Sequence, residues 1–390
     1  FERTVPPEAA QSDVYATVCA PLVAAWIAGY DVDLICYGQT GSGKTYTMFG
    51  PPHAMARAAE GLGHGGGTDT ISSDGIVAPD HGFILRAGFE ALRAVDAINS
   101  GGGGSAVLHG SMAEMSIMSF TDQTVLDLLN KNKPCYLDKS HHLQGAKHVP
   151  IKSARDLVQV AAAVETRTTR GTRMNDTSSR SHCITIFTFH QLDASGEKVR
   201  ESRFQFFDLM GSERFKGANA AHDTSASSKS TMSGWEGIFA NMSLSSLMES
   251  VRAAAVARRK GKKMLRAGMS SVLNEALDGS LQGKALTGMI TCLSQHPRNG
   301  GETALSVQYS ADMAKLLNAA APQPYRPFGR MLEKARKEYA KSAAVVKRGV
   351  AGKYQSKREA EVNGWKAKVA ILEQLNRSDD GSAGGAGQRK

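Results

Sequence analysis

A glycine-rich octapeptide, GQTGSGKT at residues 38–45, carries the clearest chemical signal in the sequence. It fits the pattern G-x-x-x-x-G-K-[ST] and follows VDLICY at residues 32–37, which reads as a buried strand. Glycines let backbone N–H groups turn inward around phosphate oxygens, and the next helix adds its positive end. Lys44 would supply charge to the β- and γ-phosphates, and Thr45 a hydroxyl to Mg²⁺. The predicted nucleotide-binding residues are Gly38, Gln39, Thr40, Gly41, Ser42, Gly43, Lys44 and Thr45.

A phosphate loop of this kind needs a second strand that delivers a carboxylate near the metal. The best candidate is Asp208, which ends the apolar run FQFF. An acid in this position is more often a strand-end cap, but beside a phosphate loop we favour the metal role. Gly211, three residues on, could turn its amide toward a γ-phosphate and sense whether that phosphate is present.

Upstream of this strand, NDTSSRSH at residues 175–182 places several hydroxyl groups around Arg180. The segment reads either as a polar turn before a strand or as a second loop over the phosphates. In the second reading, Arg180 and Glu213 each lie one loop from the phosphate and could pair when the site closes.

Strand and helix patterns alternate along the chain. Residues 183–190 alternate with period two, and Ser195-Gly196 turns the chain toward a second strand at residues 203–207, which predicts a hairpin. Helical patterns cover residues 14–28, 154–166, 240–257 and 303–318. The alternation predicts an α/β sandwich with a mixed central sheet.

Composition excludes several classes of protein. With 41% apolar and 22% charged residues, the chain is globular. No apolar run approaches the roughly 18 residues of a membrane span, and the first residues do not form a signal peptide. Five scattered cysteines argue against a disulfide framework or structural zinc, and favour a reducing compartment.

The formal net charge of +10 is unevenly distributed. Residues 330–377 contain 13 Lys or Arg and 5 Asp or Glu, and a second basic cluster, RRKGKK, occupies residues 258–263. Basic runs are either solvated faces or contacts to an acidic partner such as nucleic acid, an anionic membrane or an acidic protein surface.

The segment PQPYRP at residues 322–327 breaks the chain, because closely spaced prolines keep it extended. We therefore predict a globular domain at residues 1–320, a Pro-rich linker at 321–329, a basic helical extension at 330–377 and a disordered tail at 378–390. In the extension, the 3-4-3 spacing of Val362, Trp365, Val369 and Leu372 favours packing against a neighbouring element over a short dimerising coiled coil.

Three of these segments together resemble the motor domain of the kinesin family. The family pattern is a GQTGSGKT phosphate loop, an N-x-x-S-S-R-S-H switch I and a D-L-A-G-S-E switch II, matched here at residues 38–45, 175–182 and 208–213, with Met210 in place of Ala. Further matches cover residues 1–5 (a strand in the family), 11–15, 125–129, 236–247 and 301–315. The resemblance implies a kinesin-type P-loop NTPase, a three-layer α/β/α sandwich with a central mixed sheet.

The resemblance also implies roles for single residues. ATP or ADP with Mg²⁺ would be the bound cofactor, and Ser178 and Ser179 would close over the γ-phosphate and the metal. Thr45, Ser179 and Asp208 would hold Mg²⁺, the last through water. The catalytic set would be Gly211 as γ-phosphate sensor, Ser179, and an Arg180–Glu213 salt bridge with Glu213 as final proton acceptor.

The sequence departs from the family pattern in several places. The family's domain begins before Phe1, with a strand and an adenine-binding R-x-R-P segment, so we expect residues 1–320 to be incomplete at the N-terminus. The loop after switch II is not basic, and Met242 replaces a lysine. The linker does not resemble the family's neck linker, and its prolines cannot donate strand hydrogen bonds, so we do not expect it to dock on the core.

These features lead to a microtubule-binding kinesin-like ATPase as the first hypothesis, with tubulin contacts through residues 240–257 and the basic loop at 258–263. Hydrolysis would change the switch loops and the affinity for microtubules. The second hypothesis is a non-stepping, nucleotide-bound scaffold, fixed to a microtubule lattice such as a ciliary axoneme, whose C-terminal extension binds other cytoskeletal or axonemal proteins. A P-loop enzyme acting on nucleic acid is a third hypothesis without motif support. The implied location is cytoplasmic, on microtubules.

Overall fold

The computed structural model describes residues 2–51, 81–101, 104–117, 123–138, 143–164, 167, 181–212, 228–262, 271–316, 318–349 and 355–383. Within these ranges, the side chains of residues 116–117, 123–124, 228–241 and 377–383 are not described.

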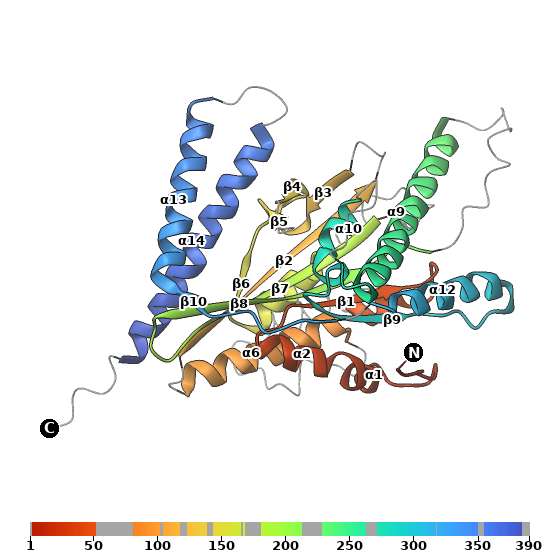
Figure 1. Ribbon diagram of the computed structural model, residues 1–390, viewed down its shortest axis with the longest axis horizontal. Coiled ribbons are helices and arrows are strands. Elements are labelled where there is room, and N and C mark those ends of the chain that lie inside the picture. Colours follow the sequence, from red (N-terminus) through yellow and green to blue (C-terminus); the bar gives the residue numbers. More distant parts are fainter. Residues whose placement is uncertain are drawn as a thin grey trace.

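A central mixed sheet organises the described part of the chain (Figure 1). Its main path runs β5-β4-β3-β2-β7-β8-β1-β9, with β6 on β2 and β10 on β8. β1 is parallel to β8 and β9, whereas the other pairs are antiparallel. The strands are β1 Val32–Tyr37, β2 Ser105–Ile117, β3 Gln123–Asp127, β4 Lys133–Leu137, β5 Leu143–Gln144, β6 Val149–Ile151, β7 Ser181–Leu192, β8 Lys198–Asp208, β9 Leu286–Thr291 and β10 Arg326–Pro327.

Helices cover both faces of this sheet, because successive side chains of a strand point to opposite faces. On one face pack α1 Gln11–Val18, α2 Ala20–Ile27, α3 Lys44–Phe49, α6 Phe83–Ser100 and α7 Ala154–Ala162. On the other pack α9 Ser228–Arg259, α10 Val272–Ala276, α11 Asp278–Leu281 and α12 Gly300–Met313. The predicted three-layer α/β/α sandwich is confirmed.

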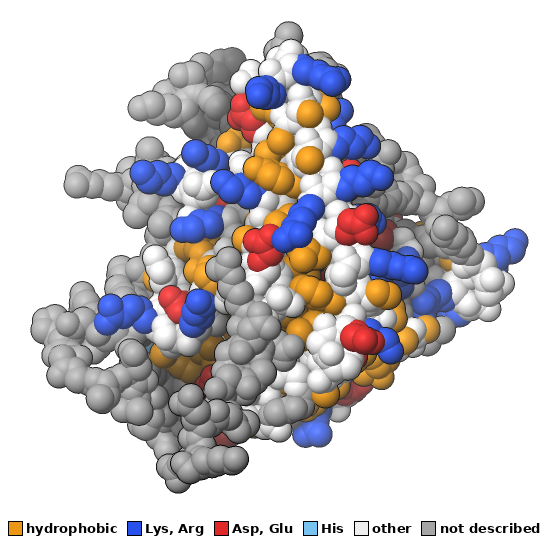
Figure 2. Space-filling view, turned by 90° about the vertical axis from the view of Figure 1, so that its left-hand side faces the viewer, with side chains coloured by type: hydrophobic (Ala, Val, Ile, Leu, Met, Phe, Trp, Pro, Cys, Tyr) orange, Lys and Arg blue, Asp and Glu red, His pale blue; other side chains and the backbone are white. Residues whose placement is uncertain are grey.

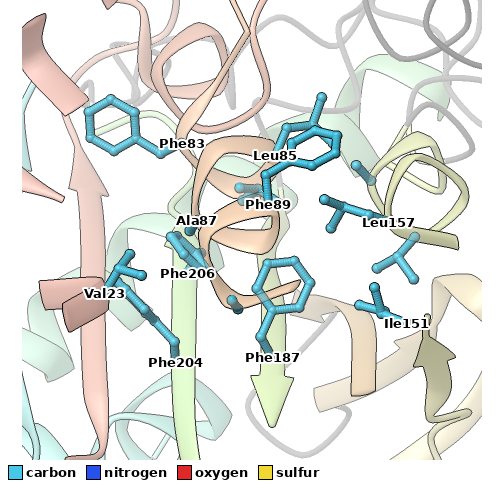
Figure 3. Close-up of a cluster of buried hydrophobic side chains, with 14 of the residues drawn as sticks. Val23, Phe83, Leu85, Ala87, Phe89, Ile151, Leu157, Phe187, Phe204 and Phe206 are labelled. Atoms are coloured by element: carbon cyan, nitrogen blue, oxygen red, sulfur yellow. The ribbon is translucent and has the colours of Figure 1, made fainter. Parts of the chain in front are cut away.

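The larger core lies between the sheet and the helices α2, α6 and α7 (Figure 3). Phe204 and Phe206 of β8 stack with ring centroids 4.1 Å apart, and Phe187 of β7 meets Phe206 edge-on. Burial of several aromatic rings at one place holds β7 and β8, and therefore the end of β8, in a fixed position.

Most predicted elements are present, with shifted ends. The β1 strand and the β7–β8 hairpin are confirmed, and Gly196 has the positive φ of 71° that its turn requires. The helix predicted at residues 14–28 is wrong. It is two helices, α1 and α2, and Pro21 lies in the first turn of α2, where its missing amide hydrogen does no harm. The strand that the resemblance implied at residues 1–5 is also wrong, since residues 2–6 form no strand.

The Pro-rich segment lies along the core, against expectation. Gln323 donates from its backbone N–H to the Gly29 carbonyl (2.7 Å) and from Nε2 to Asp31 Oδ2 (2.8 Å). The Arg200 guanidinium lies 4.8 Å from the centroid of the Tyr325 ring, and β10 pairs with the beginning of β8. The prolines do not prevent docking, because the residue between Pro322 and Pro324 supplies the donors.

Two further helices, α13 Phe328–Lys347 and α14 Gln355–Ala383, form a hairpin on the same face of the sheet as α9 (Figure 1). Its core contains Val107, Leu192 and Val199 from the sheet, with Leu372 and Leu375 from α14. Trp365 and Val369 pack on the edge of this cluster. Three residues of the predicted apolar stripe are thus used within the chain. α14 also continues beyond residue 377, where the extension was predicted to end, and residues 384–390 lie outside the described part.

Figure 2 shows the side of the molecule that lies at the left of Figure 1, where α13 and α14 are found. Lys and Arg side chains are spread over this face, with fewer Asp and Glu side chains among them. Among the described residues, no helix combines the length and apolar character needed to cross a membrane.

Three histidines lie between the sheet and α14. The rings of His109 and His190 meet edge-on at 5.7 Å, and His190 Nε2 lies 3.3 Å from Glu201 Oε2, which also accepts from Lys368 of α14. Loss of hydration, followed by the neighbouring His190 and Lys368, lowers the pKa of His148 to about 4. Loss of hydration, followed by the charge of Lys368, lowers the pKa of His190 well below its usual value. Loss of hydration is also the main reason why the pKa of His109 falls to about 2. These imidazoles are therefore neutral in the folded protein near pH 7.

This cluster predicts that acidification destabilises the fold. Unfolded histidines bind protons near pH 6.5, whereas the folded ones do so only near pH 4 or below, so the free energy of unfolding should fall as the pH drops from about 6.5 to 4. Lys368 does not contribute in this window, because its pKa is lowered only to about 8. Each histidine adds up to about 1.4 kcal/mol per pH unit. Urea unfolding at a series of pH values measures the slope.

The His148→Gln variant should show a shallower slope, because one titrating imidazole is gone. Carboxylates titrate alike in both proteins, so the difference isolates the histidine. Substitution of the exposed His296 by Gln provides the matched control and should leave the slope unchanged. Equal slopes in the His148→Gln variant and the unsubstituted protein would contradict the assignment.

Candidate nucleotide site

The predicted phosphate loop connects β1 to α3, and its shape depends on three glycines. Gly38, Gly41 and Gly43 have φ values of 146°, 77° and 104°, and Gly43 is the N-cap of α3. Gly41 and Gly43 have open space around them, whereas a Cβ atom on Gly38 would overlap the carbonyl oxygen of Cys292. The left-handed backbone and this close approach explain why glycine is required.

Lys44 begins α3 and is buried, with its ammonium group directed back across the loop. Its Nζ donates to the Gln39 carbonyl oxygen at 2.8 Å, and the same oxygen accepts from Ser42 Oγ at 2.8 Å. The loop is closed around one carbonyl oxygen, and a phosphate oxygen is a stronger acceptor for the same ammonium group.

Thr45 and Asp208 meet where β1 and β8 end. The parallel register places Cys36 opposite Asp208, and Thr45 Oγ1 donates to Asp208 Oδ2 at 2.9 Å. The other carboxylate oxygen, Asp208 Oδ1, is buried and has no hydrogen-bond partner within the described ranges. A hydroxyl and an unsatisfied carboxylate oxygen side by side are hard oxygen donors, which fit Mg²⁺ together with phosphate and water. No group of three or more His, Cys, Asp or Glu in the described part forms an alternative metal site.

A buried arginine that the sequence did not reveal completes this region. Arg167 Nη1 pairs with Asp208 Oδ2 at 3.1 Å, and Arg167 Nε donates to Ser181 Oγ at 3.1 Å. Ser181 Oγ in turn donates to Glu114 Oε1 at 2.6 Å. Arg167 therefore connects Asp208, at the C-terminal end of β8, to Ser181, which in turn contacts Glu114. Its segment, TRTTRGTR, contains three arginines at similar spacing, so no local pattern distinguishes this one.

The chain beyond Asp208 runs beside the phosphate loop. Leu209 N–H donates to the Cys36 carbonyl at 3.2 Å and Ser212 N–H to the Gly38 carbonyl at 3.1 Å, so Gly211 lies next to the start of the loop. The predicted proximity of Gly211 to the phosphate loop is present in the structure.

His182 links this segment to α9. Its Nδ1 accepts from Met210 N–H at 3.3 Å, and its Nε2 lies 2.9 Å from Ser243 Oγ. Burial, and secondarily the Arg167 charge, lower the pKa of His182 to about 3, so the ring is neutral. Because Nδ1 accepts, the single ring proton is on Nε2, which donates to Ser243.

The structure thus brings together the predicted loop residues, Asp208 and Gly211. Four other predicted residues, Ser178, Ser179, Arg180 and Glu213, lie outside the described residues, as does Lys263 of the basic cluster.

A glycine loop between a strand and a helix, with a lysine, a threonine and a facing aspartate, defines the class of P-loop NTPases. The family model for the kinesin motor domain matches residues 1–316. The chain therefore belongs to the kinesin family.

Curated relatives and solved structures agree with this assignment. The chain is 28% identical over 312 residues to Kinesin-like protein KIN-1 of Oryza sativa subsp. japonica, covering 79% of this chain and 58% of the relative. It is 29% identical over 324 residues to Kinesin-like protein KIN-8A of Arabidopsis thaliana, covering 81% and 38%. The chain thus spans about half or less of the length of these relatives.

Two solved structures share the fold. One, of a fast kinesin, has a TM-score of 0.63 at 21% identity, and covers 83% of this chain and 82% of its own. The other is the Drosophila kinesin family member NOD in complex with AMPPNP, with a TM-score of 0.55 at 20% identity, covering 81% and 85%.

The buried Arg167–Asp208 pair predicts a large cost when one partner is removed. Arg167→Ala leaves the Asp208 carboxylate buried without its cation, and should lower the free energy of unfolding by about 3–5 kcal/mol. Arg167→Ala with Asp208→Asn should cost less than the sum of the two single variants. Urea unfolding of the four proteins measures this coupling.

Arg203→Ala is the matched control, because Arg203 pairs with Asp31 at 3.6 Å and both are only half-buried. This variant should cost about 1 kcal/mol or less. Additive effects of Arg167→Ala and Asp208→Asn would refute the coupling.

Proposed function

We propose that the chain is a microtubule-binding kinesin-like ATPase, in which nucleotide binding and hydrolysis change the switch segments and the affinity for microtubules. The observation that carries the proposal is the convergence of Lys44, Thr45 and Asp208 at one edge of the sheet, connected through Met210, His182 and Ser243 to α9. Family membership supports microtubules as the partner and the cytoplasm as the location.

The site residues that the structure describes would each have a role in binding ATP. The ammonium group of Lys44 exchanges the Gln39 carbonyl for phosphate oxygens, and the glycine loop directs its N–H groups toward them. Mg²⁺, when bound, neutralises charge on the phosphates. Thr45 and Asp208 would hold it, with Ser179 as the third residue. The chemistry otherwise asks the protein mainly for positioning.

The resemblance assigns the remaining steps to the switch residues. Ser178 and Ser179 close over the γ-phosphate, Gly211 donates to it, and an Arg180–Glu213 salt bridge positions water with Glu213 as final proton acceptor. Movement at Gly211 pulls on Met210, and the neutral His182 passes this movement to Ser243 of α9.

The C-terminal end of α9 is a suitable place for contact with an acidic lattice. Arg259, Lys260 and Lys262 are exposed there, whereas Arg258 donates to the Gln282 carbonyl at 2.6 Å and is held on the domain. Exposed positive charge attracts an acidic surface, raises the association rate and makes binding sensitive to salt.

The first test of this function is ATP turnover with and without microtubules. Lys44→Ala removes a charge-assisted contact of about 1.5–3 kcal/mol, so ATP affinity should fall roughly 10- to 150-fold and turnover should be lost. Lys334→Ala, in the exposed part of α13, is the control and should keep both. Nucleotide affinity by calorimetry and phosphate release by a coupled assay are the measurements.

Microtubules should accelerate turnover of the unsubstituted protein. If turnover occurs but microtubules do not change it, the motor function is wrong and a nucleotide-bound scaffold remains. If ATP does not bind, the nucleotide function itself is wrong.

The second test concerns the basic loop. Substitution of Arg259, Lys260 and Lys262 by Ala together removes three exposed charges, and exposed pairs contribute about 0.2–1 kcal/mol each. Microtubule binding should weaken roughly 3- to 150-fold, and its salt dependence should become shallower. Cosedimentation with microtubules at several salt concentrations is the measurement.

The control variant replaces Lys334, Lys337 and Lys341 of α13 by Ala. These lysines are also exposed, so the variant loses the same number of charges at a different place. It should bind microtubules as the unsubstituted protein does. Equal weakening by both triple variants would show that net charge acts, and that the loop at the end of α9 has no special role.

A further inference from the structure

Two free thiols face one another directly behind the phosphate loop. Cys36 is the fifth residue of β1 and is fully buried, and Cys292 follows the last residue of β9 and is half-buried. Their sulfur atoms lie 3.7 Å apart. Neither thiol has a role in the proposed nucleotide chemistry.

The surroundings of Cys292 connect this pair mechanically to the nucleotide site. Its sulfur lies 3.8 Å from Thr47 Oγ1 on α3, the helix that begins with Lys44. Its backbone N–H donates to the Tyr37 carbonyl at 2.8 Å, and its carbonyl oxygen lies 2.2 Å from where a Cβ atom on Gly38 would be. A displacement of Cys292 therefore pushes on the start of the phosphate loop or on α3.

The two thiols are also chemically unequal. Hydrogen bonds from Cys36 and Thr47, together with the Lys44 ammonium group, lower the pKa of Cys292 although burial opposes this. The hydrogen bond to Cys292, with burial, raises the pKa of Cys36. Burial raises the pKa of Cys183 to about 12, and those of Cys19 and Cys135 are raised for the same reason. Cys292 is the best nucleophile among the five, since reactivity requires a thiolate that reagents can reach.

We propose that Cys36 and Cys292 form a reversible disulfide on exposure to a hydroperoxide, and that this bond weakens nucleotide binding. The Cys292 thiolate attacks one peroxide oxygen, which gives a sulfenic acid and, with the released proton, one water. The Cys36 sulfur then attacks the sulfenic sulfur and expels its hydroxyl group, which leaves as a second water with the Cys36 proton. Two thiols lose two electrons and two protons, and one hydrogen peroxide becomes two waters.

The effect on the nucleotide follows from geometry and rests on the proposed function. A disulfide has a sulfur–sulfur distance of about 2.05 Å, so the 3.7 Å separation must shorten considerably. Cys36 is fixed inside β1, between β8 and β9, so most of the movement falls on Cys292. Because its carbonyl already touches Gly38, this movement disturbs the loop that directs Lys44 and the backbone N–H groups toward phosphate.

The experiment treats the whole reduced chain with hydrogen peroxide and then blocks the remaining thiols with N-ethylmaleimide. Peptide mapping by mass spectrometry should find one cross-linked species that joins Cys36 to Cys292, with Cys19, Cys135 and Cys183 still reduced. Affinity for a fluorescent ADP analogue should fall at least tenfold, and dithiothreitol should restore it. Cys36→Ser and Cys292→Ser should each keep their affinity after peroxide, and Cys135→Ser is the control that should respond as the unsubstituted protein does.

Two results would overturn the proposal. In one, Cys292 is oxidised to the sulfinic acid, or stays a thiol, without a Cys36–Cys292 cross-link. In the other, the cross-link forms and ADP affinity is unchanged. Mapping of the cross-link needs no nucleotide, so failure of the reduced protein to bind ADP would instead count against the proposed function. Mapping on the unsubstituted chain also remains informative if a serine variant does not fold.

Discussion

The parallel pairing of β1 with β8 is the constraint on which the site depends. Parallel strands end at the same edge of a sheet, so the loop after β1 and the acid that ends β8 meet without a further structural device. The hydrogen bond from Thr45 to Asp208 closes this junction. A change of one residue in the register would turn Asp208 to the opposite face of the sheet and separate the two groups. The aromatic packing of Phe204 and Phe206, on the same strand, makes such a change costly.

This constraint places an acid where burial is expensive, and Arg167 offsets part of the cost. A carboxylate out of water needs a cation and hydrogen bonds, and Asp208 receives both from Arg167 and Thr45 through a single oxygen. The second oxygen has no hydrogen-bond partner among the described residues. A buried carboxylate oxygen of this kind suits a ligand of positive charge, which supports the proposed Mg²⁺ role.

The sequence was sufficient for the phosphate loop, β1, the β7–β8 hairpin and the sandwich, because each depends on local chemistry or on periodicity. It was insufficient where distant residues decide. Arg167 is selected by the carboxylate that it meets 41 residues later, and the partners of His182 lie on two other elements. The docking of Gln323 depends on the carbonyl of Gly29, which lies in the turn after α2 and is 294 residues away in the sequence. Pro21 was visible in the sequence, but a proline in a first helical turn and a proline inside a helix look alike until the helix start is known.

Strand β8 ends at Asp208, and its first residues lie next to the hairpin of α13 and α14. β8 has eleven residues and spans about 35 Å at 3.3 Å per residue, with β10 paired to its first two. Within the described residues, the segment at Gly211 connects to α9 through one hydrogen-bonded histidine, whereas it connects to α13 and α14 through the sheet and its aromatic packing. Lys368 and the cluster around Leu372 fix the hairpin to that sheet directly. Release of the linker at Gln323 would therefore leave the hairpin attached to the sheet. Under the proposed function, α9 is therefore the described element best connected to respond to the nucleotide.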